Sequence, residues 1–253
     1  MLRSINSLNR YTIHATDDDI GHVHDFYFDD ESWAICYLVA DTGTWLPGRK
    51  VLISPAVLGR PNWKSEKFPV GLTKDQVKNS PDIDRIKPAS RQQEVQLHKY
   101  YDWPPYWSPT RQVTSEYLHT TRSQTGIPSR LLQELEMVEH HPPETTLRSA
   151  KEVMGYHIQA SDGEIGHVED FMADESNWII RYMVVDTRNW LPGRKVLVPP
   201  ERIETVAWDE KKVFVNMSQV DIENSPEYDP SGSIERHYER RLYDHYQWPP
   251  YWA

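Results

Sequence analysis

Three histidines near the start of the chain have the residue type and spacing of a metal site. His22 and His24 are two positions apart, so on a β-strand their side chains would share one face, and His14 precedes them. The chain repeats itself 145 residues later, however, and of the three only His22 recurs as a histidine, at His167. A duplicated metal site would have kept its ligands, so the sequence predicts neither a metal nor another cofactor.

Two pairs of aspartates are the next candidates for chemistry. Asp25 recurs as Asp170 and Asp29 as Asp174, and such carboxylates could act as paired catalytic acids. Hydrolysis also needs a nucleophile and oxyanion donors, and the sequence contains no Gly-rich phosphate loop, serine nucleophile elbow or Cys–His arrangement. We therefore predict turn and strand-end roles for these aspartates and no enzymatic activity.

A tryptophan, a Pro-Gly turn and an Arg-Lys pair occur together in both copies. The cations and the N–H groups of the turn could bind an anion or a partner. Alternatively, the arginine pairs with Asp41 or Asp186 and stacks on the tryptophan, which would hold the turn in place. We favour this structural role and keep the residues as candidates for interaction or anion binding: Trp45, Arg49, Lys50, Trp190, Arg194 and Lys195.

Each copy ends in the same aromatic segment, Trp-Pro-Pro-Tyr-Trp, at residues 103–107 and 248–252. It could be a short polyproline II ligand for an aromatic groove of a partner protein. It could equally fold back, with the prolines fixing the chain so that the tryptophans cover their own domain. Because the segment terminates both copies, we favour self-packing.

The elements that must position these residues follow from the duplication. Residues 41–52 and 186–197 are identical at ten of twelve positions, and each segment lies between apolar runs. This pattern predicts a strand, a Pro-Gly turn and a second strand. The repeat extends without a gap from residue 11 to residue 107, so the chain is two copies of one unit. We expect the two copies to pack as a pseudo-twofold pair.

The strand before this turn, residues 33–41, alternates with period two. One of its faces is the same in both copies, and we predict that this shared face is the interior. Its members are Trp33, Ile35, Tyr37, Val39 and Asp41, matched by Trp178, Ile180, Tyr182, Val184 and Asp186.

Shorter signals complete the unit. Strands are predicted over residues 11–14, 20–26 and 50–53 with their counterparts, and a further hairpin over residues 203–216 of the second copy. Helical turns are predicted over residues 73–79 and 218–224, and a longer helix ends each copy. Gly21 indicates a bulge or close backbone approach.

The expected domains are residues 1–107, a linker of residues 108–152 with a helix over 129–139, and residues 153–253.

Composition limits the function classes. The formal net charge is −10, which disfavours specific binding to nucleic acid. Cys36 is the single cysteine, so an intrachain disulfide and a zinc–thiolate site are excluded. The first residues lack the apolar stretch of a secretory signal, and no apolar run reaches the roughly 18 residues that span a bilayer. We expect a cytoplasmic protein without a transmembrane segment.

Several segments resemble the PRC-barrel family. They are residues 166–170 (Gly-His-Val-Glu-Asp), the apolar strand of residues 178–185, and residues 193–199 (Gly-Arg-Lys-Val-Leu-Val-Pro), with their counterparts in the first copy. This family is named for the cytoplasmic domain of the photosynthetic reaction-centre H subunit and also includes a domain of a ribosome-maturation factor. The resemblance covers roughly residues 10–80 and 155–225. It implies a mainly β fold of two tandem small β-barrels, each followed by a short helix and the aromatic tail.

The resemblance also implies an adaptor or scaffold rather than an enzyme. Such a protein would bind a protein partner, form a homodimer, or dock peripherally on a membrane or electron-transfer complex. Two alternatives stay open: an RNA- or ribosome-associated processing factor, and a barrel that binds a small ligand. Salt-dependent RNA binding would favour the first alternative, and a large apolar pocket with convergent polar groups the second.

Overall fold

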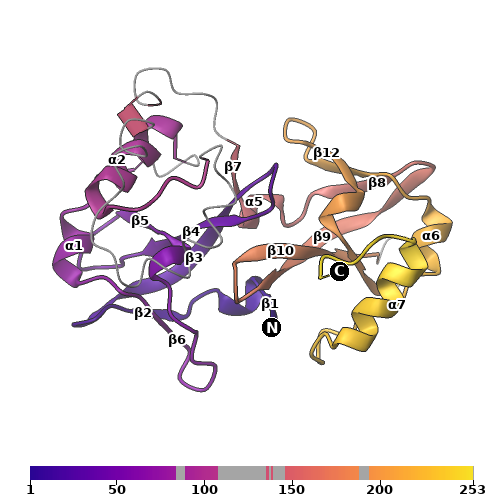
Figure 1. The fold of residues 1–253 in the computed structure, drawn as a ribbon, viewed down its shortest axis with the longest axis horizontal. Helices are drawn as coiled ribbons and strands as arrows, with labels where there is room; N and C mark the ends of the chain where they lie inside the picture. Colours follow the sequence, from indigo (N-terminus) through magenta and orange to yellow (C-terminus); the bar gives the residue numbers. More distant parts are fainter. Residues whose placement is uncertain (84–88, 108–134, 137, 139–145, 188–193, 253) are drawn as a thin grey trace. The chain divides into compact units, whose positions relative to one another are not determined.

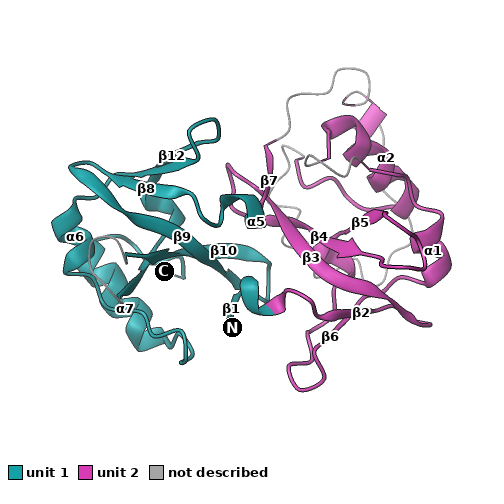
Figure 2. Ribbon diagram, turned by 180° about the vertical axis from the view of Figure 1, so that it is seen from behind, with its two compact units in different colours: residues 1–7, 150–253 teal, residues 8–149 magenta. Residues whose placement is uncertain are grey.

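The computed structural model describes the chain except residues 84–88, 108–134, 137, 139–145, 188–193 and 253. The fold is mainly β, with two mixed sheets in two compact units (Figure 2). Unit 1 comprises Met1–Ser7 and Ala150–Ala253, and unit 2 comprises Leu8–Ser149. The mainly β class and the two-part organisation are therefore confirmed.

Unit 2 holds a six-stranded sheet in which β2 and β6 are parallel and the other pairs are antiparallel (Figure 1). Its path runs β5-β4-β3-β2-β6, and β7 pairs with β3 off this path. The strands are β2 (Thr12–His14), β3 (Asp19–Asp29), β4 (Ile35–Asp41), β5 (Lys50–Ile53), β6 (Lys67–Pro69) and β7 (Leu147–Ser149).

Unit 1 repeats this plan in a seven-stranded sheet with the path β11-β10-β9-β8-β13-β12, and β1 pairs with β9. The predicted hairpin over residues 203–216 forms β12 and β13. In both sheets, none of the described pairings joins the two ends of the path, so the described strands do not close a barrel. The strands are β1 (Leu2–Ser4), β8 (His157–Ala160), β9 (Gly163–Asp174), β10 (Ile179–Asp186), β11 (Lys195–Val198), β12 (Ile203–Ala207) and β13 (Lys212–Val215).

The predicted helical segments form, and three of them begin with a capping box, whereas α7 has no side-chain cap. Thr73 and Ser218 cap α1 (Lys74–Lys78) and α6 (Gln219–Glu223) with complete capping boxes. Ser90 and Gln93 form the same box at the start of α2 (Arg91–Tyr101). The structure also describes α5 (Ala150–Val153), α7 (Arg236–Tyr246) and the 3-10 turns η1 (Asn6–Leu8), η2 (Pro55–Val57) and η3 (Pro200–Arg202). The predicted linker helix over residues 129–139 lies mostly outside the described residues.

The prediction that only one face of the strand over residues 33–41 is interior was too narrow. In β4 the residues between the shared ones are buried as well, and Asp41, a member of the shared set, is exposed. Both faces of this strand are covered: the Tyr37 side chain of the shared face contacts His98 on α2, and Cys36, Leu38 and Ala40 of the other face are buried as well. Trp33 precedes the strand, with a left-handed φ of 59°. Period-two alternation separates the faces of a strand, but it does not show whether the second face is covered.

Gly21 lies where two backbones approach closely, as predicted. A Cβ atom at this position would be 2.0 Å from the carbonyl oxygen of Asp41. Gly166 in the second copy meets Asp186 at the same distance. The φ angles of 137° and 141° are also unfavourable for residues with a Cβ, so only glycine fits.

The two repeats exchange their leading strands. Leu2–Ser4 precedes the first copy in the sequence but pairs with β9 of unit 1. Leu147–Ser149 precedes the second copy but pairs with β3 of unit 2. Both strands read Leu-Arg-Ser and are 145 residues apart, which is the offset of the repeat itself. The duplication therefore extends into residues 1–9 and into the segment expected to be a linker.

Candidate functional site

The exchanged strands lie on edges that the rest of each sheet leaves uncovered. Along β3, one edge pairs with β4 and the other pairs with β2 only as far as His22. β7 continues this second edge, with Ser149 opposite Tyr27 and Leu147 opposite Asp29. β1 fills the equivalent edge of β9 in the same register. Without these strands both edges would expose unpaired backbone groups. We call these two positions the strand seats.

A serine–aspartate hydrogen bond fixes each exchanged strand in its seat. Ser149 Oγ donates to Asp25 Oδ2 at 2.5 Å in unit 2, and Ser4 Oγ donates to Asp170 Oδ2 in unit 1. The other carboxylate oxygen of Asp170 accepts the backbone N–H of Asn6 at 3.0 Å. Burial raises the pKa of Asp170, and these hydrogen bonds act against that increase. The aspartates suspected of acid catalysis thus hold the exchanged strands.

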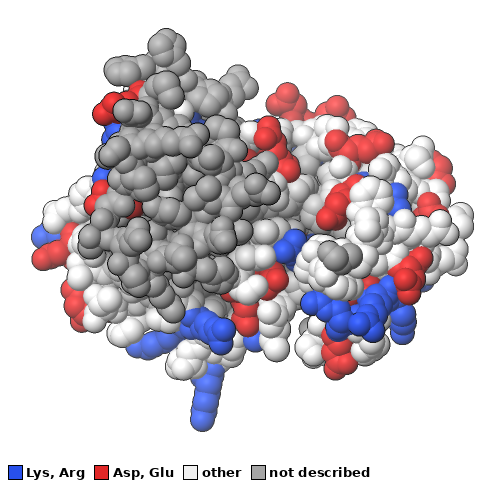
Figure 3. All heavy atoms as spheres, viewed as in Figure 1, with Lys and Arg blue, Asp and Glu red and all other residues white. Residues whose placement is uncertain are grey.

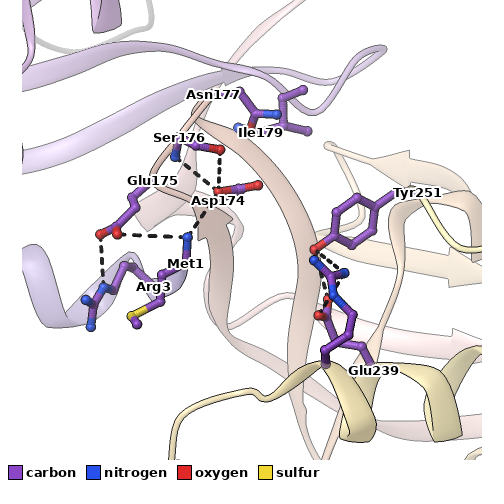
Figure 4. A network of polar contacts seen from close by, with 10 residues as sticks. Met1, Arg3, Asp174, Glu175, Ser176, Asn177, Ile179, Glu239 and Tyr251 are labelled. Atoms are coloured by element: carbon purple, nitrogen blue, oxygen red, sulfur yellow. Dashed lines mark hydrogen bonds and ion pairs between the residues drawn. The ribbon is translucent and has the colours of Figure 1, made fainter. Parts of the chain in front are cut away.

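Ion pairs add a second contact at each seat. Arg148 Nε lies 2.9 Å from Asp30 Oδ2, and Arg3 Nε lies 3.1 Å from Glu175 Oε2 (Figure 4). All four side chains are partly exposed, so each pair contributes little to stability. Because serine and arginine make the same contacts in both units, Leu-Arg-Ser is the common recognition sequence of the seats.

The second pair of aspartates closes the turns beside the seats. Asp174 accepts hydrogen bonds from the backbone and hydroxyl of Ser176, and the amino group of Met1 lies 3.4 Å from it (Figure 4). Burial raises the pKa of Asp174, but the Ser176 hydrogen bonds and the amino group outweigh it, so the net pKa is lowered. Asp29 accepts from Ser32 and from Thr146 Oγ1. The predicted turn and strand-end roles are confirmed for Asp29 and Asp174, whereas Asp25 and Asp170 lie inside β3 and β9.

A buried polar cluster joins the final helix of each repeat to its aromatic tail. In unit 2 the fully buried Glu94 accepts from Tyr106 Oη at 2.6 Å and pairs with Arg91 Nη1 at 3.1 Å. The Arg91 guanidinium also lies 4.3 Å from the ring centre of Trp107. A buried carboxylate is stable only with such partners. The contacts confirm that the tail packs on its own domain.

Unit 1 repeats this cluster with one substitution. Glu239 accepts a hydrogen bond of 2.9 Å from Tyr251 Oη (Figure 4). It also accepts from Tyr182 Oη at 2.9 Å and pairs with Arg236 at 3.1 Å. Tyr243 occupies the position that His98 has in unit 2.

His98 itself is neutral and has a fixed tautomer. Burial lowers its pKa to about 4. Its Nδ1 lies 3.1 Å from the carbonyl oxygen of Trp103, which can only accept, so Nδ1 carries the proton. Nε2 therefore accepts the hydrogen bond of 2.6 Å from Tyr37 Oη.

The first Arg-Lys turn is anchored to the end of a helix. Arg49 Nη1 donates to Lys78 O at 2.6 Å, and Nη2 donates to Ser80 O, just after α1. The carbonyl groups at a helix C-terminus carry partial negative charge, which a cation stabilises. This partner differs from the predicted Asp41. Lys74, rather than Arg49, lies over the Trp45 ring at 5.0 Å, and Trp45 Nε1 donates to Ile20 O at 2.8 Å.

The second turn is anchored in the same way where it is described. Arg194 Nη2 donates to Ser225 O, which follows α6. Lys195 Nζ contacts Glu169 Oε1 at 2.5 Å, and Lys50 opens β5 opposite Asp41. Trp190 lies outside the described residues. The two arginines therefore already bind backbone carbonyls, while an anion-binding role for the six candidate residues stays a prediction.

His14 Nδ1 lies 2.6 Å from Asp19, and no group of three or more metal-ligating side chains occurs among the described residues. Within the same part of the chain, no helix is both long and apolar enough to cross a membrane.

The exposed side of α7 is basic, although the chain as a whole is acidic. Arg236, His237, Arg240 and Arg241 are exposed there, and Figure 3 shows Lys and Arg side chains gathered over this helix. The equivalent helix α2 has no counterpart to this face, since its residues 95 and 96 are Val and Gln. This basic face could not be found from the similarity between the repeats, because it lies where they differ.

Comparison of the chain with models of known protein families gives no match, and comparison with curated proteins gives none either. The PRC-barrel resemblance therefore remains a hypothesis based on the residues quoted for it.

Proposed function

We propose that the chain is a non-enzymatic, PRC-barrel-like scaffold that binds an acidic protein partner through the basic face of α7. The observation that carries this proposal is the exposed Arg240 and Arg241 in a chain with a net charge of −10. A local basic face on an acidic protein favours one orientation of encounter and selects partners of opposite charge. The acidic partner could be a protein of a membrane or electron-transfer complex, on which the resemblance implies peripheral docking.

The charged residues common to both repeats support a structural rather than a chemical role for the shared framework. Arg49 and Arg194 bind helix-end carbonyls, Asp25 and Asp170 bind the exchanged strands, and Glu94 and Glu239 bind the tails. A side chain held in such contacts is not available to a substrate without rearrangement. The surface in which the repeats differ is then the better place to look for a partner.

The small-ligand alternative has less support in the described residues. A pocket of about 250 Å³ lies before α7, and the acidic residues Glu227, Asp229 and Glu235 line it together with Tyr228 and Tyr238. Ligand pockets are usually larger and predominantly apolar.

The test is the double charge reversal Arg240→Glu plus Arg241→Glu. The matched control is Arg60→Glu plus Lys64→Glu, which makes the same charge change at exposed positions of unit 2. Quantitative affinity purification with cross-linking from the native host is expected to recover an acidic partner with the unmodified chain and the control. The α7 variant should lose it, and the cross-links should map to α7. Equal recovery with both variants would contradict the proposal.

RNA binding is tested in the same variants. Filter binding of total RNA at about 50 mM and 200 mM salt distinguishes phosphate contacts, which weaken steeply over this range. Sub-micromolar, salt-sensitive binding that disappears with Arg240→Glu plus Arg241→Glu, or with Arg49→Ala plus Arg194→Ala, would replace the scaffold by the RNA-associated alternative. We expect no such binding.

A further inference from the structure

We propose that the strand seat of unit 1 also accepts the Leu2–Ser4 strand of a second copy of this chain, which gives a strand-exchanged dimer. The seat consists of the edge of β9 at residues 172–174 together with Asp170 and Glu175. This inference goes beyond the scaffold function and does not depend on it.

The seat recognises its strand only through contacts that the strand itself makes. These contacts are the antiparallel ladder, the Ser4–Asp170 hydrogen bond, the Arg3–Glu175 ion pair and the Ile5 N–H bond to Phe171 O at 2.9 Å. The strand comes from more than 160 positions away in the sequence, so local chain connectivity does not define the fit. A second copy presents an identical strand, and adding a strand to a sheet edge is an established mode of protein association.

An empty seat would be unfavourable, so it needs an occupant. Met172 and Ala173 at this edge are 5% and 1% exposed with β1 in place. Removing β1 would also expose the unpaired edge of β9 and leave the Asp170 carboxylate without the Ser4 hydroxyl. The same strand from either chain restores the same contacts. The monomer, in which β1 occupies its own seat, and the dimer, in which it occupies the seat of the other chain, therefore differ mainly in the conformation of the connection that follows β1.

That connection carries an unfavourable backbone conformation in unit 2. Arg10 has a φ of 70°, which is uncommon for a residue with a Cβ. Its counterpart is Gly155, with a φ of 99°, and glycine adopts this region readily. Straightening the chain at Arg10 to reach another molecule would remove the unfavourable conformation, at the loss of the Arg10 N–H bond to Val23 O. No such gain follows at Gly155.

Burial also distinguishes the two exchanged strands. Leu147 of β7 is fully buried, whereas Leu2 of β1 is partly exposed. β1 is therefore the strand expected to pass between copies, and β7 is expected to remain in its own chain. Because β1 and its seat belong to one chain, pairing within a molecule is favoured when the protein is dilute, and the dimer should form during refolding at high protein concentration.

Disulfide trapping tests this exchange. Glu175 N–H donates to Met1 O at 3.0 Å, so the alternation of the ladder places Leu2 and Asp174 in a non-hydrogen-bonded pair, with Cα atoms about 4.5 Å apart. In a Cys36→Ala background, one chain carries Leu2→Cys and the other carries Asp174→Cys. They are refolded together and oxidised with molecular oxygen. The control mixture replaces Asp174→Cys by Glu210→Cys, an exposed position away from β9.

The expected result is a covalent heterodimer about ten-fold more abundant than in the control mixture, increasing with the protein concentration during refolding. A single chain with both substitutions should close an internal disulfide when refolded dilute. If that chain closes its disulfide but the mixed chains never form more covalent heterodimer than the control mixture, exchange is confined to one molecule and the proposal is wrong. If neither forms, β1 does not occupy the seat, and the proposal is also wrong.

A second measurement avoids the introduced cysteines. Light scattering after concentrated refolding should show dimer in the unmodified chain and less dimer in Arg10→Gly, because glycine removes the unfavourable conformation from the closed form. An equal dimer fraction in the two proteins would contradict the role of Arg10, and absence of dimer in both would contradict the exchange itself.

Discussion

Ser149 Oγ donates a hydrogen bond of 2.5 Å to Asp25 Oδ2, although the two residues are 124 positions apart. Ser4 and Asp170 form the equivalent bond in unit 1. Each bond joins a strand that precedes one repeat to the sheet formed by the other. The residues most readily taken for catalytic acids in the sequence thereby become contacts that hold exchanged strands.

Removing the serine hydroxyl should destabilise unit 2. Ser149→Ala leaves the buried Asp25 carboxylate without this donor, which typically costs about 1–3 kcal/mol. Chemical denaturation with a probe in unit 2 measures the loss. Ser65→Ala, at an exposed position, is the control and should change stability by less than about 0.5 kcal/mol. Equal stability of the two variants would show that the Ser149 bond contributes nothing.

The leucines of the exchanged strands should differ in importance. Leu147→Ala removes a fully buried side chain and should cost about 2–5 kcal/mol. Leu2→Ala should cost clearly less, because Leu2 is partly exposed. Thermal melts of both variants provide the comparison, and a larger loss for Leu2→Ala would contradict the burial seen here.

The aromatic tail should stabilise the domain that carries it. Tyr106→Phe removes a donor to the fully buried Glu94 and should cost about 1–3 kcal/mol. The matched variant Tyr251→Phe should cost less, because its cluster is more open to solvent: the Arg236 side chain is 49% exposed, whereas the equivalent Arg91 is 4% exposed. Denaturation curves decide this, and no effect of Tyr106→Phe would mean that the tail is not fixed through this hydroxyl.

Acid should weaken unit 2 through His98. Its pKa is about 4 in the folded protein and about 6.5 when exposed, so between these values only the unfolded state binds the proton. The stability that His98 contributes is thus present above pH 6.5 and falls as the pH decreases toward 4, by up to about 3 kcal/mol. Measuring unfolding of unit 2 against pH tests this dependence.

The control for this pH dependence is His98→Tyr, which introduces the residue that unit 1 has at Tyr243. Burial raises the pKa of Asp30, which acts in the opposite direction, but Asp30 is present in both proteins, so their difference isolates His98. The variant should lose the part of the pH slope between about 6.5 and 4. An unchanged slope would show that the folded protein does not hold His98 buried in its neutral form.

Much of the fold could be predicted because its signals are local or duplicated. The strand pair around the Pro-Gly turn, the capping boxes at Thr73 and Ser90, and the close approach at Gly21 depend on neighbouring residues and on the repeat. That the second face of β4 is also buried depends instead on packing within the folded unit, which the alternation along the strand does not show. The sequence also predicts that Trp190, which lies outside the described residues, is buried, so that Trp190→Ala should cost roughly 3–5 kcal/mol.

The exchanged strands were missed for a physical reason. Three-residue strands carry almost no periodic signal, and their partners lie more than 100 positions away. The available signal was the recurrence of Leu-Arg-Ser at the repeat offset, in Leu2–Ser4 and Leu147–Ser149. Such recurrence predicts that the segment belongs to the repeat, but not which copy of the sheet it joins, because both seats fit it equally.

The most direct test of the strand exchange is nuclear Overhauser contact between Hα protons in the dilute, monomeric chain. The Asp30 N–H bond to Thr146 O fixes the ladder so that Tyr27 and Ser149 form a non-hydrogen-bonded pair, with Cα atoms about 4.5 Å apart. The exchange of strands between the two repeats of one chain predicts strong Hα–Hα contacts from Tyr27 to Ser149 and from Met172 to Ser4. Contacts from Tyr27 to Ser4 and from Met172 to Ser149 would show that each repeat keeps its own strand, and would contradict the account.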